Sequence, residues 1–241
     1  MDQSRVVSRD DWLVARKALL AREKELTRLR DQLSAERRSL PWVEVDKKYA
    51  FEAPGGRETL ADLFGSRSQL IIYHFMFDPE WQEGCPSCSF VADHIDGALA
   101  HLAARDLTLL AVSRAPLARI EAFKRRMGWR FKWVSSHGSD FNYDFHTTTD
   151  EAVAPVEYNY RDKATLEQLG QTYHMKGEQP GASAFLRKGD RVYHTYSTYG
   201  RGLDLLVGAY NYLDLAPKGR DEDALVFTME WLRHHDRYGN G

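Results

Sequence analysis

The chain has 241 residues, enough for one domain with a substantial hydrophobic core. Its 33 basic and 35 acidic residues nearly balance, so no net field favours nucleic acid as a partner. The N-terminus, Met1-Asp2-Gln3-Ser4-Arg5, leads into charged sequence instead of an apolar signal core, and no apolar run is long enough to cross a bilayer. We therefore expect a cytoplasmic protein with neither nucleic acid nor membrane as a partner.

The first segment has the pattern of a long helix. Ser8 and Asp11 form a capping-box-like start, and helix-forming residues continue to about Leu40. Apolar side chains recur every seven residues, at Trp12, Leu19, Leu26, Leu33 and Leu40. The second seam position is only partly apolar, with Ala15 and Leu29 but also Arg22 and Glu36. A helix that packs on its own domain and a helix that joins copies in a homo-oligomer both explain this pattern.

Pro41 ends the helix, and residues 42–52 alternate like a strand. Pro54-Gly55-Gly56 marks a turn, and residues 59–64 read as a short helix or turn. The apolar run 69–77 then predicts a buried strand.

The only two cysteines follow that strand, in Cys85-Pro86-Ser87-Cys88, a CxxC spacing. Pro86 fits the first turn of a helix, which places Cys85 at the helix start and Cys88 one turn later. The N–H groups and dipole of a helix N-terminus favour a thiolate, so we expect Cys85 to have a lowered pKa and to act as nucleophile. Cys88 would resolve the mixed disulfide.

The two cysteines have two other interpretations. They could be half of a zinc site completed by His74 and His94, although the chain has no second CxxC and no HxxxH. They could also be inert thiols of the core. The order of strand, loop, cysteine pair and helix favours redox chemistry, and the sequence predicts neither a metal nor a cofactor.

Strands and helices alternate in the next part of the chain. We expect a helix over 90–104, a continuous apolar strand over 107–113, a helix over 116–127 and a strand over 131–135. Such alternation predicts an α/β core with parallel strands.

Residues 137–180 show no long period and are interpreted as an insertion or lid. Residues 182–187 and 191–196 flank Lys188-Gly189-Asp190 and predict a β-hairpin. Two helices would follow, over 203–213 and from Asp221 through Trp231.

Polar and aromatic residues gather where the hairpin ends. Tyr196, Tyr199 and Arg201 could form a polar pocket beside the sulfur that positions a small anionic thiol or peroxide. The alternative is a strand end whose tyrosines bury their rings. Arg114, which follows a strand, is a second candidate anion contact, and Trp81 could lie against the disulfide or shield the loop.

Several stretches resemble the thioredoxin-like proteins of the domain of unknown function 899 family. The matching stretches are 7–12, 84–90, 111–116, 127–129, 138–144 and 194–202, which span nearly the whole chain. The resemblance implies a thioredoxin-like α/β fold, with a central mixed sheet flanked by helices. It also implies a dithiol-disulfide oxidoreductase. We expect an N-terminal helical arm over 1–40 and a thioredoxin-like domain over 41–241, with the insertion at about 137–180.

The chain departs from better-known relatives at two places. Thioredoxins carry a cis-proline just before the hairpin strand, where this chain has Gly181 or Ala182 and an early Pro180. Peroxiredoxins place a threonine three residues before the reactive cysteine, where this chain has Gln82, and Pro79 is one position off their proline. The first difference alters the backbone at the position where thioredoxins dock protein disulfides, which weakens the case for exchange with protein disulfides. The second difference favours a reductase over a peroxidase.

The leading hypothesis is a thiol-disulfide oxidoreductase that acts on a small disulfide or a protein disulfide, with Cys85 and Cys88 as the catalytic residues. One alternative is a thiol peroxidase that uses Cys85. The other is a non-enzymatic, redox-responsive or ligand-binding thioredoxin-like module.

Overall fold

The computed structural model describes residues 5–239, and the contacts divide the chain into two units, Met1–Pro41 and Trp42–Gly241. The first unit contains α1 (Arg9–Arg38), which confirms the predicted long helix. The Asp11 backbone N–H donates to Ser8 Oγ at 3.1 Å, and the Ser8 hydroxyl donates to Asp11 Oδ2 at 2.8 Å. This cap satisfies a backbone donor that has no partner within the helix.

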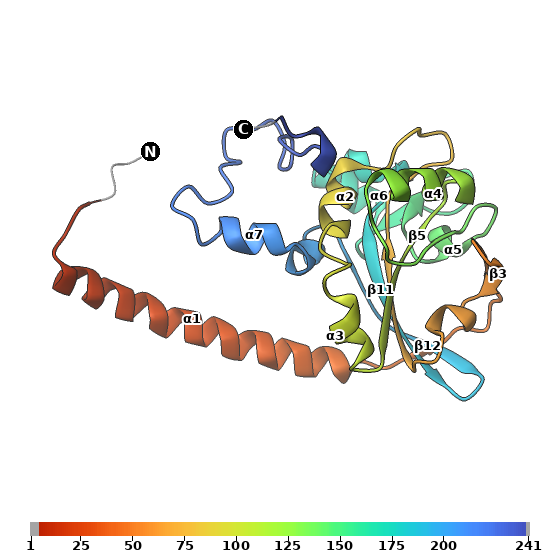
Figure 1. Cartoon of the computed structure of the whole chain (residues 1–241), viewed down its shortest axis with the longest axis horizontal. Coiled ribbons are helices and arrows are strands. Elements are labelled where there is room, and N and C mark those ends of the chain that lie inside the picture. The colour runs from red at the N-terminus through yellow and green to blue at the C-terminus, as the bar shows by residue number, and fades with distance from the viewer. Residues whose placement is uncertain (1–4, 240–241) are drawn as a thin grey trace. The chain divides into compact units, whose positions relative to one another are not determined.

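The second unit is built on an eight-stranded mixed sheet with the order β1-β12-β11-β4-β5-β6-β2-β3. Figure 1 labels β3, β5, β11 and β12 of this sheet. Its strands are β1 (Val43–Glu44), β2 (Ala50–Ala53), β3 (Gly56–Thr59), β4 (Gln69–His74), β5 (Leu107–Ser113), β6 (Trp133–Ser135), β11 (Gly181–Lys188) and β12 (Arg191–Tyr199). Two small ladders join β7 (Thr148–Thr149) to β10 (Gly177–Glu178) and β8 (Glu157–Tyr158) to β9 (Arg161–Asp162).

Short helices connect these strands. The α-helices are α2 (Pro86–Ala92), α3 (Leu99–Ala103), α4 (Leu117–Arg126), α5 (Phe141–Asp144), α6 (Lys163–Gln168) and α7 (Gly208–Leu213). The 3-10 helices are η1 (Asp62–Phe64), η2 (Thr172–His174), η3 (Gly200–Leu206) and η4 (His235–Arg237). Among the described residues, no helix has both the length and the apolar character that a membrane span requires.

The middle of the sheet has the thioredoxin-like arrangement. Strands β4 and β5 are parallel, and α2 and α3 lie between them in the chain. Strand β11 runs antiparallel to β4 and pairs with β12 in the predicted hairpin. Gly189 has a φ of +59° in the hairpin turn, a conformation that glycine adopts without strain. The protein therefore has the predicted thioredoxin-like α/β fold.

Strand β4 separates two hydrophobic cores because its side chains alternate. Tyr73 and, directly after the strand, Phe75 face the first core, which also contains side chains of α2 and α4. Leu70 and Ile72 face the second core, where the His74 ring stacks on the rings of α5 and the residue after it. Each fully buried large side chain stabilises the fold by roughly 1.5–3 kcal/mol. The cysteines lie against the first core.

The segment 42–52, predicted as one strand, forms two. Strand β1 pairs with β12 at one edge of the sheet, whereas β2 lies between β6 and β3 near the other edge. Residues 45–49 cross between the edges, and the Lys47 ammonium donates to Asp144 Oδ2 at 2.6 Å on the way. The alternation of apolar residues in the sequence has the same phase on both sides of residues 45–49 and so did not predict the break between β1 and β2.

The helix predicted over 90–104 is also divided, into α2 and α3. Asp93 and Asp96 lie at the break and accept hydrogen bonds from distant groups. The Trp129 indole N–H donates to Asp93 at 2.8 Å, and the backbone N–H of Phe131 donates to Asp96 at 2.7 Å. Hydrogen bonds to residues distant in the sequence therefore interrupt the predicted helix between α2 and α3.

The C-terminal region differs most from the prediction. Residues 203–213 form parts of η3 and α7, and the segment from Asp221 to Trp231 contains no helix. Instead, Glu222 Oε1 accepts hydrogen bonds from the Tyr210 hydroxyl at 2.8 Å, the Trp231 indole N–H at 2.7 Å and the Met229 backbone N–H at 3.1 Å. One carboxylate organises this segment in place of helical backbone bonds.

Candidate functional site

Cys85 is the residue that precedes the first turn of α2. Pro86 opens the helix, where its missing N–H costs nothing. The Cys85 backbone N–H donates to the Met76 carbonyl at 3.1 Å, and its carbonyl accepts from the Ser89 N–H at 2.9 Å. These bonds fix the position of Cys85 between the loop and the helix, as the sequence predicted.

The two thiols differ in exposure. Cys85 is half-buried, whereas Cys88 is 2% exposed. The Met76 backbone N–H donates to Cys88 Sγ at 3.4 Å. Cys85 is therefore the more exposed of the two cysteines.

Their acidities differ in the same sense. The pKa of Cys85 is lowered to about 7, first by a hydrogen bond from the Cys88 side chain and then by the backbone N–H groups of Cys88 and Ser87, against the opposing effect of burial. Burial raises the pKa of Cys88 well above its ordinary value, and the neighbouring Cys85 sulfur raises it further. The pair thus combines a half-buried Cys85 of lowered pKa with a buried Cys88 thiol that donates a hydrogen bond to the Cys85 sulfur.

Tyr73 is a residue of this site that the sequence did not single out. Its side chain is 1% exposed, and its hydroxyl makes no hydrogen bond of normal geometry within the described residues. Burial raises its pKa well above the ordinary value, and interaction with Cys88 is the next cause. Tyr73 therefore remains a neutral phenol beside Cys88, able to donate to that sulfur when it ionises. The one signal in the sequence was its place on the apolar strand β4, where alternation turns Tyr73 towards the first core.

Replacing Tyr73 with Phe should slow ionisation of Cys88 without destabilising the fold. The Tyr73 hydroxyl makes no hydrogen bond of normal geometry while Cys88 is a neutral thiol, so the free energy of unfolding in urea should stay the same or rise when it is removed. A hydrogen bond to a charged group is worth about 1.5–3 kcal/mol, so formation of the Cys85–Cys88 disulfide from a mixed disulfide should slow about tenfold or more. Quenched-flow mass spectrometry measures that step.

Tyr158→Phe is the matched control. Its side chain is equally buried, but its hydroxyl donates to the Pro180 carbonyl at 2.9 Å and accepts from the Gly200 N–H at 2.9 Å. This variant should lose stability by about 1–3 kcal/mol. A comparable stability loss in Tyr73→Phe, or an unchanged resolution rate, would contradict the role given to Tyr73.

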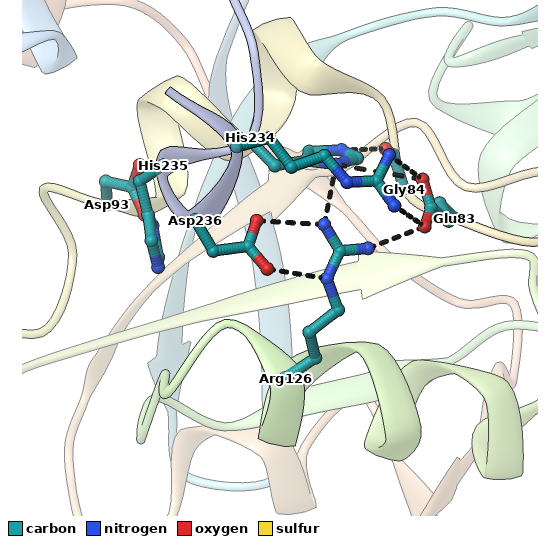
Figure 2. Close-up of polar contacts among 8 residues, drawn as sticks. Glu83, Gly84, Asp93, Arg126, His234, His235 and Asp236 are labelled. Atoms are coloured by element: carbon teal, nitrogen blue, oxygen red, sulfur yellow. Dashed lines mark hydrogen bonds and ion pairs between the residues drawn. The ribbon is translucent and has the colours of Figure 1, made fainter. Parts of the chain in front are cut away.

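Residues from the C-terminal segment hold the loop that leads to Cys85. Arg126 Nη1 donates to Glu83 Oε1 at 2.6 Å, while its Nε and Nη2 donate to the two Asp236 carboxylate oxygens at 2.8 and 2.9 Å (Figure 2). Arg237 donates to the same Glu83 from the other side. Two carboxylates and two guanidinium groups therefore bind the loop to α4 and η4.

His234 extends this network to the residue next to Cys85. The ring is 4% exposed, with Nδ1 at 3.1 Å from Arg126 Nη2 and Nε2 at 2.9 Å from the Gly84 carbonyl (Figure 2). Arginine can only donate, so Nδ1 accepts and Nε2 carries the hydrogen that it donates to Gly84. The C-terminal segment thereby fixes both residues that precede Cys85, a contact that joins positions 150 apart.

Trp81 lies in the same loop and is 38% exposed. Its backbone N–H donates to the Asp78 carbonyl at 3.1 Å, and its own carbonyl accepts from Arg119 at 2.8 Å. Trp81 precedes Cys85 by four residues in the sequence, and the structure leaves part of its side chain open to solvent.

Arg114, the second candidate anion contact, is already paired. Its Nη1 donates to Glu178 Oε1 at 2.8 Å, and its guanidinium stacks over the Tyr143 ring at 5.0 Å. Thr148 also donates to Glu178. Burial nevertheless raises the pKa of Glu178 to about 7, against the opposing charge and hydrogen bonds of Arg114. An exogenous anion would have to displace this carboxylate.

Glu178 should make stability fall as pH rises. Its pKa is about 7 in the folded chain against an ordinary value of 4.5, so the folded state binds one more proton than the unfolded state between these values. The free energy of unfolding should decrease by about 3 kcal/mol across that window through this group. Urea unfolding of Glu178→Gln at pH 4.5 to 7 should lack this decrease, whereas Glu151→Gln, at an exposed pair with Lys163, should retain it. Parallel profiles for wild type and Glu178→Gln would contradict the shift.

The hairpin-end residues lie in other surroundings. The Tyr199 hydroxyl donates to the Phe145 carbonyl at 3.0 Å, and Arg201 pairs with Asp204 at 3.1 Å on exposed η3. Tyr196 is part-exposed on β12. A cavity of about 330 Å³ lined by Tyr199 and others adjoins Phe145, which belongs to the second core. The described contacts therefore join Tyr199 to the second core and do not bring Arg201 to Cys85.

The histidines considered as zinc ligands are engaged in the protein. His74 is fully buried, bonds Ser183 Oγ at 2.8 Å, and has its pKa lowered to about 3 by burial. His94 Nδ1 bonds the Phe90 carbonyl at 2.8 Å, and its Nε2 accepts from the Ala209 N–H at 3.0 Å. Within residues 5–239, no three metal-binding side chains gather at one point.

Several solved structures resemble the chain. A mutant of PrxQ from Xylella fastidiosa is 13% identical, with a TM-score of 0.44 over 68% of this chain and 88% of that one. The reduced 2-Cys peroxiredoxin of Plasmodium vivax is 14% identical, with a TM-score of 0.41 over 72% and 94%. StoA from Bacillus subtilis is 12% identical, with a TM-score of 0.40 over 65% and 90%. At such values the similarity says nothing about the reaction of this chain.

None of the curated proteins matches the sequence. A family model does match, over residues 1–238, and its description is "Bacterial protein of unknown function (DUF899)". The match covers almost the whole chain, including α1, the cysteine pair and the C-terminal segment that holds the loop. The chain belongs to the DUF899 family.

Proposed function

We propose that the protein is a thiol-disulfide oxidoreductase in which Cys85 attacks and Cys88 resolves. The observation that carries the proposal is the asymmetry of the pair: a half-buried Cys85 with its pKa lowered to about 7, hydrogen-bonded by a buried Cys88 with a raised pKa. A thiol with a pKa near the ambient pH combines a large thiolate fraction with high nucleophilicity.

The reaction follows from this arrangement. The Cys85 thiolate attacks one sulfur of a substrate disulfide, which forms a mixed disulfide and releases the first substrate thiolate. Cys88 then loses its proton, and its thiolate attacks Cys85 Sγ. The second substrate thiolate leaves, and both leaving groups take up protons. Two electrons pass from the cysteine pair to the substrate, and an external dithiol restores the reduced pair.

The surroundings assist each step. While Cys85 is ionised, the Cys88 thiol and the backbone N–H groups stabilise its charge. Once Cys85 is bound in the mixed disulfide, that charge is gone, so the pKa of Cys88 falls and resolution becomes easier. The Met76 N–H and the Tyr73 hydroxyl are then available to the Cys88 thiolate.

The substrate class is a small disulfide or a protein disulfide. Cys85 is half-buried, and Trp81, four residues earlier in the same loop, is partly exposed and offers an apolar surface for docking. We place the protein in the cytoplasm, where the reducing environment keeps such a pair in the dithiol form.

Glutathione disulfide is a direct test. Reduced protein mixed with excess glutathione disulfide should release two glutathione molecules per chain, and its mass should fall by two hydrogen atoms. Cys88→Ser should release one glutathione and keep the other as an adduct on Cys85. If the wild-type protein releases no thiol, the pair is not an exchange site, and the non-enzymatic module becomes the better description.

A further inference from the structure

Helix α1 carries an apolar seam that the described residues of its own unit, 5–41, do not bury. Its seam residues Trp12, Leu19, Leu26 and Leu33 are 46, 51, 58 and 47% exposed, and the helix has no buried residue. The helix has 30 residues and is therefore about 45 Å long. Helices of this length in water usually depend on packing of an apolar face against a partner.

The spacing of the seam defines the shape of that partner. The four residues recur every seven positions, a 3.5-residue period that keeps one stripe facing a second helix only when the two helices supercoil. In heptad letters these residues occupy position a, and Ala15, Arg22, Leu29 and Glu36 occupy position d. A second copy of α1 supplies the same stripe.

The charges beside the seam select the orientation. In a parallel, in-register pair, each g residue lies beside the following e residue of the other helix. Asp11 then meets Arg16 of the second copy, and Glu25 meets Arg30 of the second copy. An antiparallel pair of equal overlap would instead set Arg16 against Arg37 and would keep one kind of attractive e–e pair, Glu23 against Arg30.

In the parallel, in-register pair the two charged seam residues face their own copies, Arg22 against Arg22 and Glu36 against Glu36, and an oppositely charged e residue of the facing helix lies beside each of them. A d residue packs beside the e residue of the facing helix, so Arg22 lies beside Glu23 of the second copy, and Glu36 lies beside Arg37 of the second copy. In a two-stranded coil the long Arg22 and Glu36 side chains also reach water at the flank of the seam. A larger bundle would enclose them, which is costly for charged groups.

We propose that α1 binds α1 of a second copy of this chain in a parallel, in-register, two-stranded coiled coil. The surface consists of Trp12, Leu19, Leu26 and Leu33, flanked by the pairs described above. Dimer formation is independent of the cysteine chemistry, so its failure leaves the proposed reaction untouched.

Sedimentation of the full chain tests the stoichiometry. The wild type and a Cys85→Ser/Cys88→Ser variant should both show twice the 27.7 kDa chain mass. Leu26→Asp should be monomeric at the same concentration, because it places a charge in the seam. Leu20→Asp is the matched control, since Leu20 is an exposed leucine of α1 off the seam, and it should remain dimeric. A monomeric wild type, or equal effects of the two substitutions, would overturn the proposal.

Cross-linking tests the orientation. In the Cys85→Ser/Cys88→Ser background, Leu26→Cys should form an intermolecular disulfide rapidly with diamide, because a parallel pair sets position 26 opposite itself. Leu20→Cys should cross-link far more slowly. If the Leu26→Cys protein is a dimer that does not cross-link, the parallel arrangement is wrong.

Discussion

Cys85→Ser should reduce thiol-dependent disulfide turnover on the order of 1,000-fold or more. A serine hydroxyl does not ionise near neutral pH, so the substitution removes the thiolate that the Cys88 thiol and the backbone N–H groups of α2 stabilise. Turnover of glutathione disulfide with a dithiol reductant measures the loss. Because Cys85 is half-buried and its thiol is replaced by a smaller hydroxyl, the free energy of unfolding should change little.

Cys88→Ser separates the role of Cys85 as the attacking cysteine from the role of Cys88 as the resolving cysteine. This variant should still react once with a disulfide, because Cys85 is intact, but the mixed disulfide should persist. The pKa of Cys85 should also rise, since the hydrogen bond from Cys88 is the largest cause of its lowering. Turnover that persists in Cys85→Ser and disappears in Cys88→Ser would reverse the assignment.

Gly84→Ala should destabilise the fold by about 1–3 kcal/mol and disturb Cys85. A Cβ at position 84 would lie 2.6 Å from Phe75 Cε1 and 2.8 Å from Phe123 Cε1. Both rings are buried, and Phe75 packs against Trp133 with ring centroids 4.4 Å apart, so neither ring can yield freely. The loop must move instead, which weakens the bond from His234 to the Gly84 carbonyl.

Urea unfolding and the alkylation rate of Cys85 measure both effects. Gly97→Ala is the control, because a Cβ there meets no atom within 4 Å, and its stability should stay the same or rise slightly. Equal stability of the two variants would show that the loop before Cys85 is not held by the packing described.

The parts of the fold that the sequence predicted are those set by local pattern. The buried strand β5 and the helix α4 follow from continuous and periodic apolar residues, and the hairpin follows from its turn. The position of Cys85 follows from Pro86, because proline marks the first turn of a helix. The position of the cysteine pair is therefore set by local sequence and needs no tertiary contact to predict it.

The remaining parts depend on contacts that no local pattern encodes. The segment after Asp221 is organised by Glu222, and its end is held by Arg126 and Glu83, which lie far away in the chain. The bond from His234 to Gly84 and the approach of Tyr73 to Cys88 arise only when the strands and helices pack. Arg114 illustrates the converse, since a plausible anion site is filled by the chain's own Glu178.

The pH dependence of Cys85 alkylation tests the central claim most directly. Fully reduced protein is treated with iodoacetamide across a pH series, and modification of Cys85 is followed by mass spectrometry, with Cys88→Ser as the comparison. An accessible, activated thiolate predicts a midpoint near pH 7 for the wild type and a higher midpoint for Cys88→Ser. A wild-type midpoint at or above the ordinary cysteine value of about 8.5, with slow labelling, would contradict the assignment of Cys85 as the nucleophile.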